Sequence, residues 1–320
     1  MATTSRRTSV AVCVPTRKRP AALSRLLESL TQLEPAEADL AVIVVDNDPE
    51  GSARASVQAY LHRFARATYE IEPEAGIPAA RNRLVALALE HAADFVAFVD
   101  DDEWVEPGWL RHLLRTARAF RADAVLGPVV PVYDDVVPQW LRDRGFYERP
   151  RAPTGSPVVQ ARTGNALVSA HLLADTAEPF PRSLAVGEDT YFFERARRRG
   201  ATMVWCDEAL AYEAVPPERA RVGWLLARAF RQGSTYSRCQ RLLGQTRRQR
   251  AVRVATCLGR LVQGLAVAVT TLPVSRVASL RAARRAAGAL GGLAGALASG
   301  PSADDSSGPS ADEVPGRTRS

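Results

Sequence analysis

The chain has 320 residues, of which 46% are hydrophobic, so it is long enough for one large globular domain or two smaller ones. Its four cysteines lie far apart without CxxC spacing, which argues against a zinc site or a disulfide framework and fits a reducing compartment. We expect no secretory signal, because the apolar run Val10 to Val14 is short and leads directly into Pro15.

The charge of the chain is unevenly distributed. Residues 219–303 contain fifteen Arg and no Asp or Glu. Because the whole chain has a net charge of +7, the remainder has a net charge of −8. A basic, apolar region that follows an acidic body favours an anionic surface as partner, either a membrane or a nucleic acid.

Short apolar runs alternate with segments of helical spacing over most of the chain, which predicts an α/β fold. The predicted strands are 10–14, 40–45, 68–71, 95–99, 124–132, an apolar strand at the end of 160–169, 202–205 and 209–213. The predicted helices are 21–33, 52–65, 76–91, 107–121 and 190–199. Residues 133–159 are rich in Pro, Arg and aromatics without a clear period and are predicted to be a long loop over the site.

The central feature of the sequence is the acidic run Asp100-Asp101-Asp102-Glu103, which directly follows a buried strand. Four adjacent carboxylates repel one another, and a bound divalent cation would relieve this repulsion. Oxygen ligands suit Mg²⁺ or Mn²⁺. The alternative is a solvated acidic turn that caps the next helix.

The alternation of elements predicts a doubly wound, mostly parallel sheet flanked by helices. Thr16, Asp46 and the acidic run follow three of its strands, and ligands of open α/β sheets bind at the carboxyl ends of strands. A dinucleotide site is disfavoured, because no GxGxxG follows the first strand.

Three further positions have a structural interpretation beside a functional one. Asp189 has the place of a helix N-cap, and Asn165 after Gly164 is compatible with a simple turn. The aromatic run Tyr191 to Phe193 is interpreted as core packing rather than as a platform for a sugar.

Six short motifs in order resemble the inverting, nucleotide-sugar-dependent glycosyltransferases of family two, which have the GT-A fold. They fall across roughly residues 9–213 and are Val12 to Thr16, Val44 to Asn47, Gly76 with Ala80 to Asn82, Phe98 to Asp102, Gly164-Asn165, and Gly187-Glu188-Asp189. A later match, Tyr212 to Arg219 with Trp224 to Gly233, resembles the subgroup of succinoglycan-type exopolysaccharide glucosyltransferases.

The resemblance implies a role for each matching residue. Asp46 would accept hydrogen bonds from the uracil of UDP, and Thr16 and Arg81 would line the same nucleoside pocket. Asp102 would bind the metal, Mn²⁺ or Mg²⁺, and Asp100 would contact the ribose or the metal's water shell. The sugar and acceptor side of the site would be formed by Asp189 as the general base, with Glu188 and Asn165 beside it.

The sequence departs from the family pattern in two ways. Family members often carry a late His as a further metal ligand, whereas this chain offers Tyr212 and Glu213 and has no His after His171. The QxxRW signature of processive synthases is also absent, so we expect the addition of a single sugar. Arg228 and Arg231 are candidates for a pyrophosphate contact, with a solvated basic helix face as the alternative.

We expect a flexible tail at 1–8, a GT-A domain at 9–218, a basic and apolar helical region at 219–299, and a disordered tail at 300–320. Neither 261–275 nor 286–303 makes a convincing membrane span, so the helical region is predicted to lie in the interface at the cytoplasmic face of the membrane. The basic residues Arg247, Arg248, Arg250, Arg253 and Arg260 would face anionic headgroups there. A soluble helical appendage or dimerisation arm is the alternative.

These observations predict a metal-dependent inverting hexosyltransferase. Its donor would be a nucleotide sugar, UDP-linked, and its acceptor a saccharide or a polyprenyl-diphosphate-linked saccharide, with no nucleic acid as partner. One alternative is a nucleotidyltransferase, although the loop 15–20 lacks the glycines that such an enzyme needs. The other is a basic nucleic-acid-binding protein, although its Arg-rich region has few aromatic residues to stack on bases.

Overall fold

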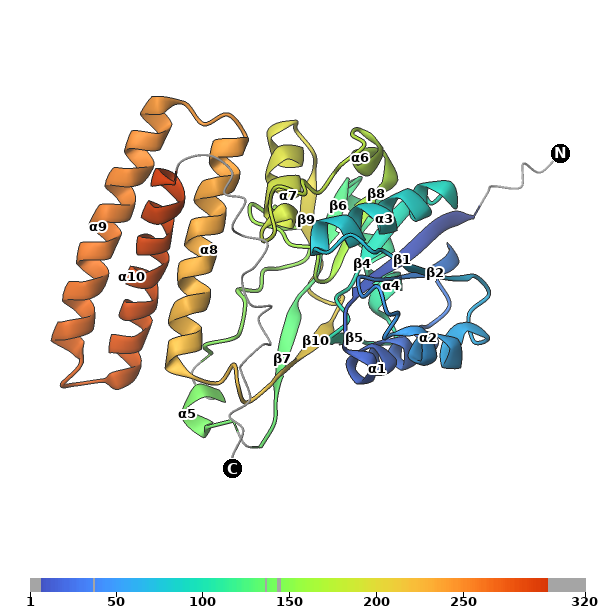
Figure 1. The fold of residues 1–320 in the computed structure, drawn as a ribbon, viewed down its shortest axis with the longest axis horizontal. Helices are drawn as coiled ribbons and strands as arrows, with labels where there is room; N and C mark the ends of the chain where they lie inside the picture. Colours follow the sequence, from blue (N-terminus) through green and yellow to red (C-terminus); the bar gives the residue numbers. More distant parts are fainter. Residues whose placement is uncertain (1–6, 37, 136, 143–144, 299–320) are drawn as a thin grey trace.

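The computed structural model describes residues 7–36, 38–135, 137–142 and 145–298. In this part of the chain, two β-sheets are flanked by helices, and a layer of three long helices lies at one end (Figure 1). Most of the tail expected at 1–8 and all of the tail expected at 300–320 lie outside the described residues, although β1 already begins at Thr8.

The larger sheet has the strand order β3-β2-β1-β4-β8-β6-β9. The pairs β3–β2, β2–β1, β1–β4 and β6–β9 are parallel, and β8 runs antiparallel to both β4 and β6. This mostly parallel arrangement confirms the predicted fold class. Its strands are β1 (Thr8–Thr16), β2 (Ala38–Asp46), β3 (Ala67–Ile71), β4 (Phe95–Phe98), β6 (Ala124–Leu126), β8 (Ala166–Ser169) and β9 (Met203–Trp205).

Helices cover both faces of this sheet, because its central strands are apolar on both sides. Val10, Val12 and Val14 of β1 pack on one face against α1 (Pro20–Thr31), α2 (Arg54–Leu61) and α4 (Trp109–Phe120). Ala11 and Cys13 pack on the other face against three further helices. Those helices are α3 (Ile77–Glu90), α6 (Ala170–Ala174) and α7 (Glu188–Arg198). Phe192 and Phe193 of α7 are buried in this second core, as their interpretation as packing residues predicted.

A smaller sheet contains β5 (Glu103–Val105), β10 (Ala211–Val215) and β7 (Val129–Tyr133) in that order. One prediction and one alternative interpretation were therefore wrong. The single strand expected at 124–132 is divided between the two sheets at Gly127, where a Cβ would lie 2.4 Å from the carbonyl oxygen of Ala209. The acidic run leads directly into a strand, β5, rather than into a helix.

The region 133–159 is less irregular than expected. It includes the end of β7 and the short helix α5 (Gln139–Arg142). Phe146 and Tyr147 belong to a third apolar cluster, which also contains Leu225 of α8 (Val222–Leu242) and Leu280 of α10 (Arg276–Leu297). The segment therefore connects the sheet domain to the C-terminal helices.

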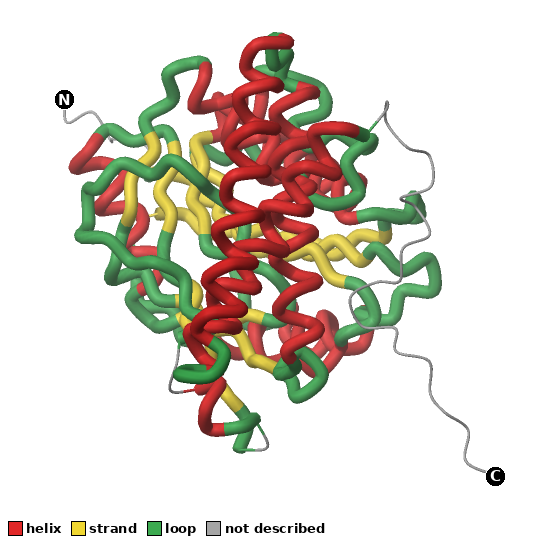
Figure 2. The backbone as a smooth tube through the Cα atoms, turned by 90° about the vertical axis from the view of Figure 1, so that its left-hand side faces the viewer, coloured by secondary structure: helices red, strands yellow, loops and turns green. Residues whose placement is uncertain are grey.

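The C-terminal region is helical, as predicted, and forms one layer. Its helices are α8 (Val222–Leu242), α9 (Arg247–Thr271) and α10 (Arg276–Leu297). The last helix, α10, lies between the other two, and α8 packs against α7 of the sheet domain (Figure 1). Seen from the end of the molecule that carries these helices, they lie in front of the strands (Figure 2). The helices α8 and α10 approach closely, because a Cβ on Gly233 would lie 1.9 Å from the carbonyl oxygen of Gly288.

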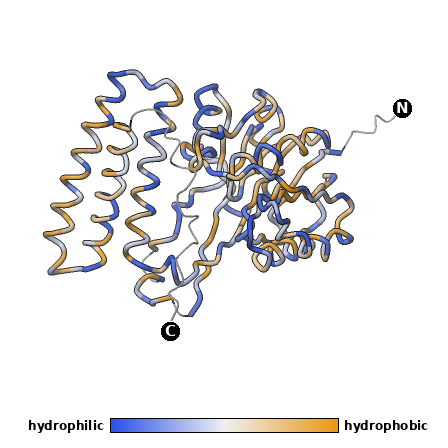
Figure 3. The backbone as a smooth tube through the Cα atoms, viewed as in Figure 1, coloured by the Kyte–Doolittle hydropathy of each residue, from blue (hydrophilic) through white to orange (hydrophobic). Residues whose placement is uncertain are grey.

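The outermost helix, α9, is rich in apolar residues (Figure 3) and exposes a stripe of them. Leu258, Val262, Leu265, Val269 and Leu272 recur at alternating spacings of four and three residues and are each at least 49% exposed. Among the described helices, α9 is the one long and apolar enough to cross a membrane. Its 25 residues extend well beyond the uncharged run 261–275 from which the sequence argued against a span.

Candidate active site

Several segments that are distant in the sequence meet at the carboxyl ends of β1 and β4. The acidic run follows β4, and Gly164-Asn165 lies at the same edge because β8 runs antiparallel to β4. The beginning of α7 approaches the same edge through Glu188. The sheet therefore brings together the predicted residues of the acidic run, Arg81, Asn165 and α7.

The four carboxylates of the acidic run point in different directions. The side chains of Asp100 and Asp102 remain 37% and 21% exposed, whereas Asp101 and Glu103 are buried. Asp101 accepts a hydrogen bond from the Thr16 hydroxyl at 2.8 Å, and Glu103 accepts one from the backbone N–H of Asp100 at 3.1 Å. Two carboxylates thus shape the loop, and two face the site.

Burial controls the protonation of this run. It raises the pKa of Asp101 to about 6, although the Arg19 guanidinium acts in the opposite direction. It also raises the pKa of Asp100, Asp102 and Glu103, and the neighbouring carboxylates add to the effect in all three cases. Such crowded acids are a place where positive charge is stabilising.

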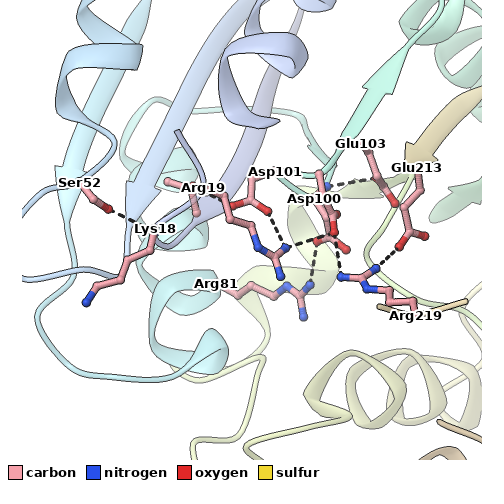
Figure 4. Close-up of polar contacts among 11 residues, drawn as sticks. Lys18, Arg19, Ser52, Arg81, Asp100, Asp101, Glu103, Glu213 and Arg219 are labelled. Atoms are coloured by element: carbon pink, nitrogen blue, oxygen red, sulfur yellow. Dashed lines mark hydrogen bonds and ion pairs between the residues drawn. The ribbon is translucent and has the colours of Figure 1, made fainter. Parts of the chain in front are cut away.

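Arg81 is the principal cation beneath the site. It is buried on α3, donates to Asp100 Oδ1 through Nη2 at 3.0 Å, and donates to Glu188 Oε1 through Nη1. Burial alone would lower the pKa of Arg81, but Glu188, Asp100 and Asp189 raise it well above its usual value. Burial raises the pKa of Glu188. The guanidinium therefore joins α3 to the loop after β4 and to α7. Its contact with Asp100 is drawn in Figure 4.

Asp189 lies in the first turn of α7, half-buried, and its Oδ1 accepts a hydrogen bond from the Thr190 N–H at 2.5 Å. The interpretation of Asp189 as an N-cap is wrong, because the N-cap is Gly187. Gly187 has a φ of 92°, and a Cβ there would lie 1.9 Å from Thr235 Cγ2 on α8. The place of Asp189 thus depends on a close contact between α7 and α8.

Two predicted site residues have side chains whose polar atoms already form hydrogen bonds within the protein. The carboxylate of Asp46 is fully buried and accepts hydrogen bonds from the N–H groups of Ala53 and Asp48 and from the Tyr69 hydroxyl. The amide of Asn165 is also fully buried, and it accepts from the Trp109 indole and donates to the carbonyl oxygens of Pro128 and Ala209. Both residues lie at the site edge, and their predicted substrate contacts stay predictions.

Asn165 has a φ of 61°, so its backbone makes the turn that the sequence suggested while its side chain has a structural role. A Cβ at the adjacent Gly164 would lie 2.7 Å from Glu103 Oε1 and 3.2 Å from Asp100 Oδ2. The Gly-Asn pair therefore allows the loop before β8 to lie against the acidic run.

Arginines from distant segments complete the site. Arg19 donates to Asp101 at 3.2 Å and to Asp102 at 3.1 Å. Arg219 lies 3.5 Å from Asp102 and donates to Glu213 at 2.7 Å (Figure 4). Sequence reasoning did not assign these two arginines, and the only signals were the basic loop 15–20 and the run 212–219.

Glu213, the candidate for a third metal ligand, is also paired with Arg149 at 3.6 Å. Arg228 lies nearby, and its pKa is lowered to about 10 by burial and by the positive charge of Arg149. The positive groups that face Glu213 therefore outnumber its single negative charge.

Within the described residues, no three His, Cys, Asp or Glu side chains are close enough to hold a metal ion between them. Asp100 and Asp102 nevertheless supply two partly exposed carboxylates from one loop. Mg²⁺ in nucleotide sites is usually held by one or two carboxylates together with substrate phosphates. The two residues thus fit a divalent cation whose other ligands would include oxygens of a bound diphosphate.

The chain matches the family described as Glycosyl transferase family 2 over residues 11–173. It is 38% identical over 234 residues to the succinoglycan biosynthesis protein ExoM of Rhizobium meliloti (strain 1021), which covers 72% of this chain and 74% of ExoM.

Solved structures show the same fold. The mannosyltransferase PcManGT of Pyrobaculum calidifontis, in complex with GDP-Man and Mn²⁺, has a TM-score of 0.59 and 16% identity, covering 91% of this chain and 88% of PcManGT. S. aureus TarS has a TM-score of 0.52 and 18% identity over 90% of this chain. The match covers 55% of the longer TarS chain and 91% of TarS 1–349 in complex with UDP.

The fold and the site define a glycosyltransferase of the GT-A type. The chain belongs to glycosyl transferase family 2. This membership favours the first of the three functions weighed from the sequence.

Proposed function

We propose that the protein transfers a single hexose from a UDP-sugar, with inversion and with Mn²⁺ or Mg²⁺, to a saccharide or polyprenyl-diphosphate-linked acceptor. The observation that carries the proposal is the convergence of Asp100, Asp102, Arg81, Glu188 and Asp189 at one edge of the sheet. ExoM, by its name a succinoglycan biosynthesis protein, supports a role in exopolysaccharide biosynthesis.

The donor would bind at the carboxyl ends of β1 and β2, with Thr16, Asp46 and Arg81 around its nucleoside. The UDP complex of TarS and the GDP-Man complex of PcManGT support a nucleotide-sugar donor. Asp100 and Asp102 would hold the cation, and Arg19 and Arg219 fix the position of Asp102. A bound divalent cation would neutralise the charge that develops on the departing diphosphate.

Asp189 would act as the general base. The acceptor hydroxyl attacks the anomeric carbon on the face opposite the diphosphate, and its proton passes to the Asp189 carboxylate. The new C–O bond forms as the C–O bond to the diphosphate breaks, so no covalent intermediate is needed. Arg81 holds both Glu188, the residue before Asp189, and Asp100 of the acidic run. Glu188 and Asn165 would border the sugar.

The enzyme would work at the cytoplasmic face of the cell membrane. The apolar stripe of α9 is exposed, and the N-terminal end of the same helix carries Arg247, Arg248 and Arg250. Apolar burial together with attraction to anionic headgroups is the usual basis of interfacial binding. The lack of acidic residues in 219–303 leaves that attraction unopposed within the segment.

Two variants test the proposal. Asp189→Asn removes the base and should reduce sugar transfer by at least ~100-fold, while Mn²⁺-dependent UDP affinity stays within about twofold, because Asp189 is not assigned to the metal. Asp102→Ala should weaken Mn²⁺-dependent UDP binding by at least tenfold (about 1.4 kcal/mol). Asp175→Asn, at an exposed carboxylate at the end of α6, is the control for both. Calorimetry and transfer from a panel of nucleotide sugars provide the measurements.

Equal UDP affinity with and without Mn²⁺ in the wild type would contradict the metal assignment. Full transfer by Asp189→Asn would remove Asp189 as the base.

A further inference from the structure

A groove of about 960 Å³ lies among α8, α9, α10 and residues 160–162. Small residues of α10, including Gly288, Ala289 and Gly292, contribute to its lining. Six arginines line the groove, and no described residue in its lining is acidic. They are Arg162, Arg253, Arg260, Arg281, Arg284 and Arg285.

The described residues that line the groove supply no carboxylate to balance this concentration of positive charge. Arg284 donates to the carbonyl oxygen of Phe146 at 2.8 Å, and the Arg253 guanidinium lies 4.8 Å from the centre of the Tyr236 ring. The Nε of Arg253 is buried and has no hydrogen-bond acceptor among the described residues. A buried donor without a partner is costly, and like charges in one groove repel one another. A multiply charged anion would relieve both.

Guanidinium groups select phosphate oxygens among anions, because their planar fork donates two parallel hydrogen bonds. The arginines come from α9, from α10 and from the loop before β8. Such a spread suits an anion with more than one phosphoryl group rather than a single carboxylate.

The groove reaches the proposed base. Thr190, the residue after Asp189, is part of its lining. The charge of Asp189 acts on Arg162, which also lines it. The donor residues Thr16 and Asp46 belong to β1 and β2 and are not part of that lining. The substrate in the groove would therefore be the one that presents its hydroxyl to Asp189.

We propose that the groove among α8, α9 and α10 binds the diphosphate group of a diphosphate-linked saccharide acceptor. The proposal rests on the proposed function, because it takes Asp189 as the base toward which the saccharide end points. The apolar stripe of α9 lies on the same helix as Arg253 and Arg260, so a prenyl chain on the diphosphate would lie close to an apolar surface.

Calorimetry on the full chain in EDTA tests this site without the metal-dependent donor site. The probes are inorganic pyrophosphate and geranyl diphosphate. Arg260→Gln/Arg285→Gln removes two exposed groove arginines and should weaken pyrophosphate binding at least tenfold. Arg247→Gln/Arg248→Gln removes the same charge from exposed positions of α9 outside the groove and should change it less than twofold.

Geranyl diphosphate distinguishes the two sources of the anion. A tenfold tighter binding than that of pyrophosphate, lost in the groove variant, supports a lipid-linked acceptor. Equal affinities that are lost in the same variant support diphosphate recognition of a soluble acceptor. The proposal is overturned if the wild type does not bind pyrophosphate. It is also overturned if the two double variants bind pyrophosphate equally well.

UDP binding with Mn²⁺, measured on the same proteins, separates this proposal from the proposed function. The groove variant should retain it within twofold, which also shows that the variant is folded. If the wild type binds pyrophosphate in the groove but shows no metal-dependent UDP binding, the proposed function fails while the anion site stands. If the groove variant loses UDP binding, Arg260→Gln alone replaces it, with a threefold loss of pyrophosphate affinity expected and no loss overturning the proposal.

Discussion

Arg81 on α3 pairs with the carboxylates of Asp100, after β4, and Glu188, on α7. Its removal should therefore lower the stability of the folded protein. Arg81→Met leaves Glu188 and Asp100 without their cation, and Glu188 is buried. Breaking a buried pair by removing one partner costs about 3–5 kcal/mol. We expect a loss of this size in the free energy of unfolding, measured by urea titration at pH 7.

The second substitution Glu188→Gln provides the control for Arg81→Met. The double variant buries no unpaired Glu188 charge, so it should recover a large part of the lost stability. A single Arg81→Met variant that loses less than ~1 kcal/mol would show that the contacts of Arg81 contribute little to folding.

Asn165 allows a structural role to be separated from a substrate contact. Asn165→Ala leaves the Trp109 indole and the carbonyl oxygens of Pro128 and Ala209 without their partners. We expect the variant to lose about 3 kcal/mol of stability, measured by thermal unfolding, with UDP affinity unchanged at 15 °C. A stable variant with weakened donor binding would instead support the direct contact that the family resemblance implies.

Individual residues differ in how far their surroundings follow from the sequence. The acidic run, Asp189 and Arg81 could be assigned because each belongs to a short local motif. The pairing of Arg19 and Arg219 with Asp102 could not, because Arg219 is 117 residues away from Asp102 in the chain and comes close only through β10 and β5. Long-range ion pairs leave no local pattern.

At the scale of elements, Glu194 takes part in the hydrogen bonds that hold α7 against α8. It accepts hydrogen bonds from Arg197 and Arg198, and Arg198 also donates to Gln240 of α8. Burial opposes ionisation, but the hydrogen bonds from Arg197, Gln240 and Arg198 outweigh it and lower the pKa of Glu194 to about 2. The helix that carries Asp189 is thus held by an ionised carboxylate.

Glu194→Gln should therefore destabilise the protein in a pH-dependent way. Because the folded-state pKa is lowered, the contribution of Glu194 is fully present above its ordinary value near 4.5 and is lost as the pH falls toward about 2. The difference in stability between wild type and variant should be constant from pH 5 to 7 and shrink below. Urea unfolding measures it.

Glu178→Gln, which breaks an exposed ion pair with Arg182, is the matched control and should change stability little. A difference for Glu194→Gln that grows toward low pH would contradict the assignment.

The periodicity of the sequence predicted most strands and helices of the larger sheet, because buried strands and amphipathic helices are continuous there. It failed at Gly127, where one apolar run serves two sheets in turn. It also missed β5, because its first residue, Glu103, is a buried acid. Pairing with β10 and burial of Val105 decide the conformation of that strand, and both are long-range.

At the scale of the whole molecule, the stripe on α9 predicts membrane binding. Val262→Gln/Leu265→Gln/Val269→Gln replaces three exposed apolar side chains and should abolish flotation with vesicles that contain anionic lipid. Val159→Gln/Val186→Gln changes two side chains of similar exposure on the sheet domain and should leave flotation intact. Flotation that persists in the α9 variant would assign membrane binding to another surface.

The layer of three helices was predicted only in its helical character. Its order could not be predicted, because the faces of α8 and α10 that meet are marked by glycines such as Gly233 and Gly288 rather than by large apolar residues. Removal of residues after 218, as a test of membrane binding, would also remove Arg219 from Asp102, so point substitutions on α9 are the cleaner test.

Among the described helices, α10 is the last to be synthesised, and it lies between α8 and α9 (Figure 1). Until residue 297 has been synthesised, α8 and α9 lack the partner that both of them need. A frameshift within α10 would spare every residue of the catalytic edge and still remove one wall of the arginine groove. Under the functions proposed above, such an altered protein would still bind its nucleotide sugar but would lack the groove that binds the acceptor.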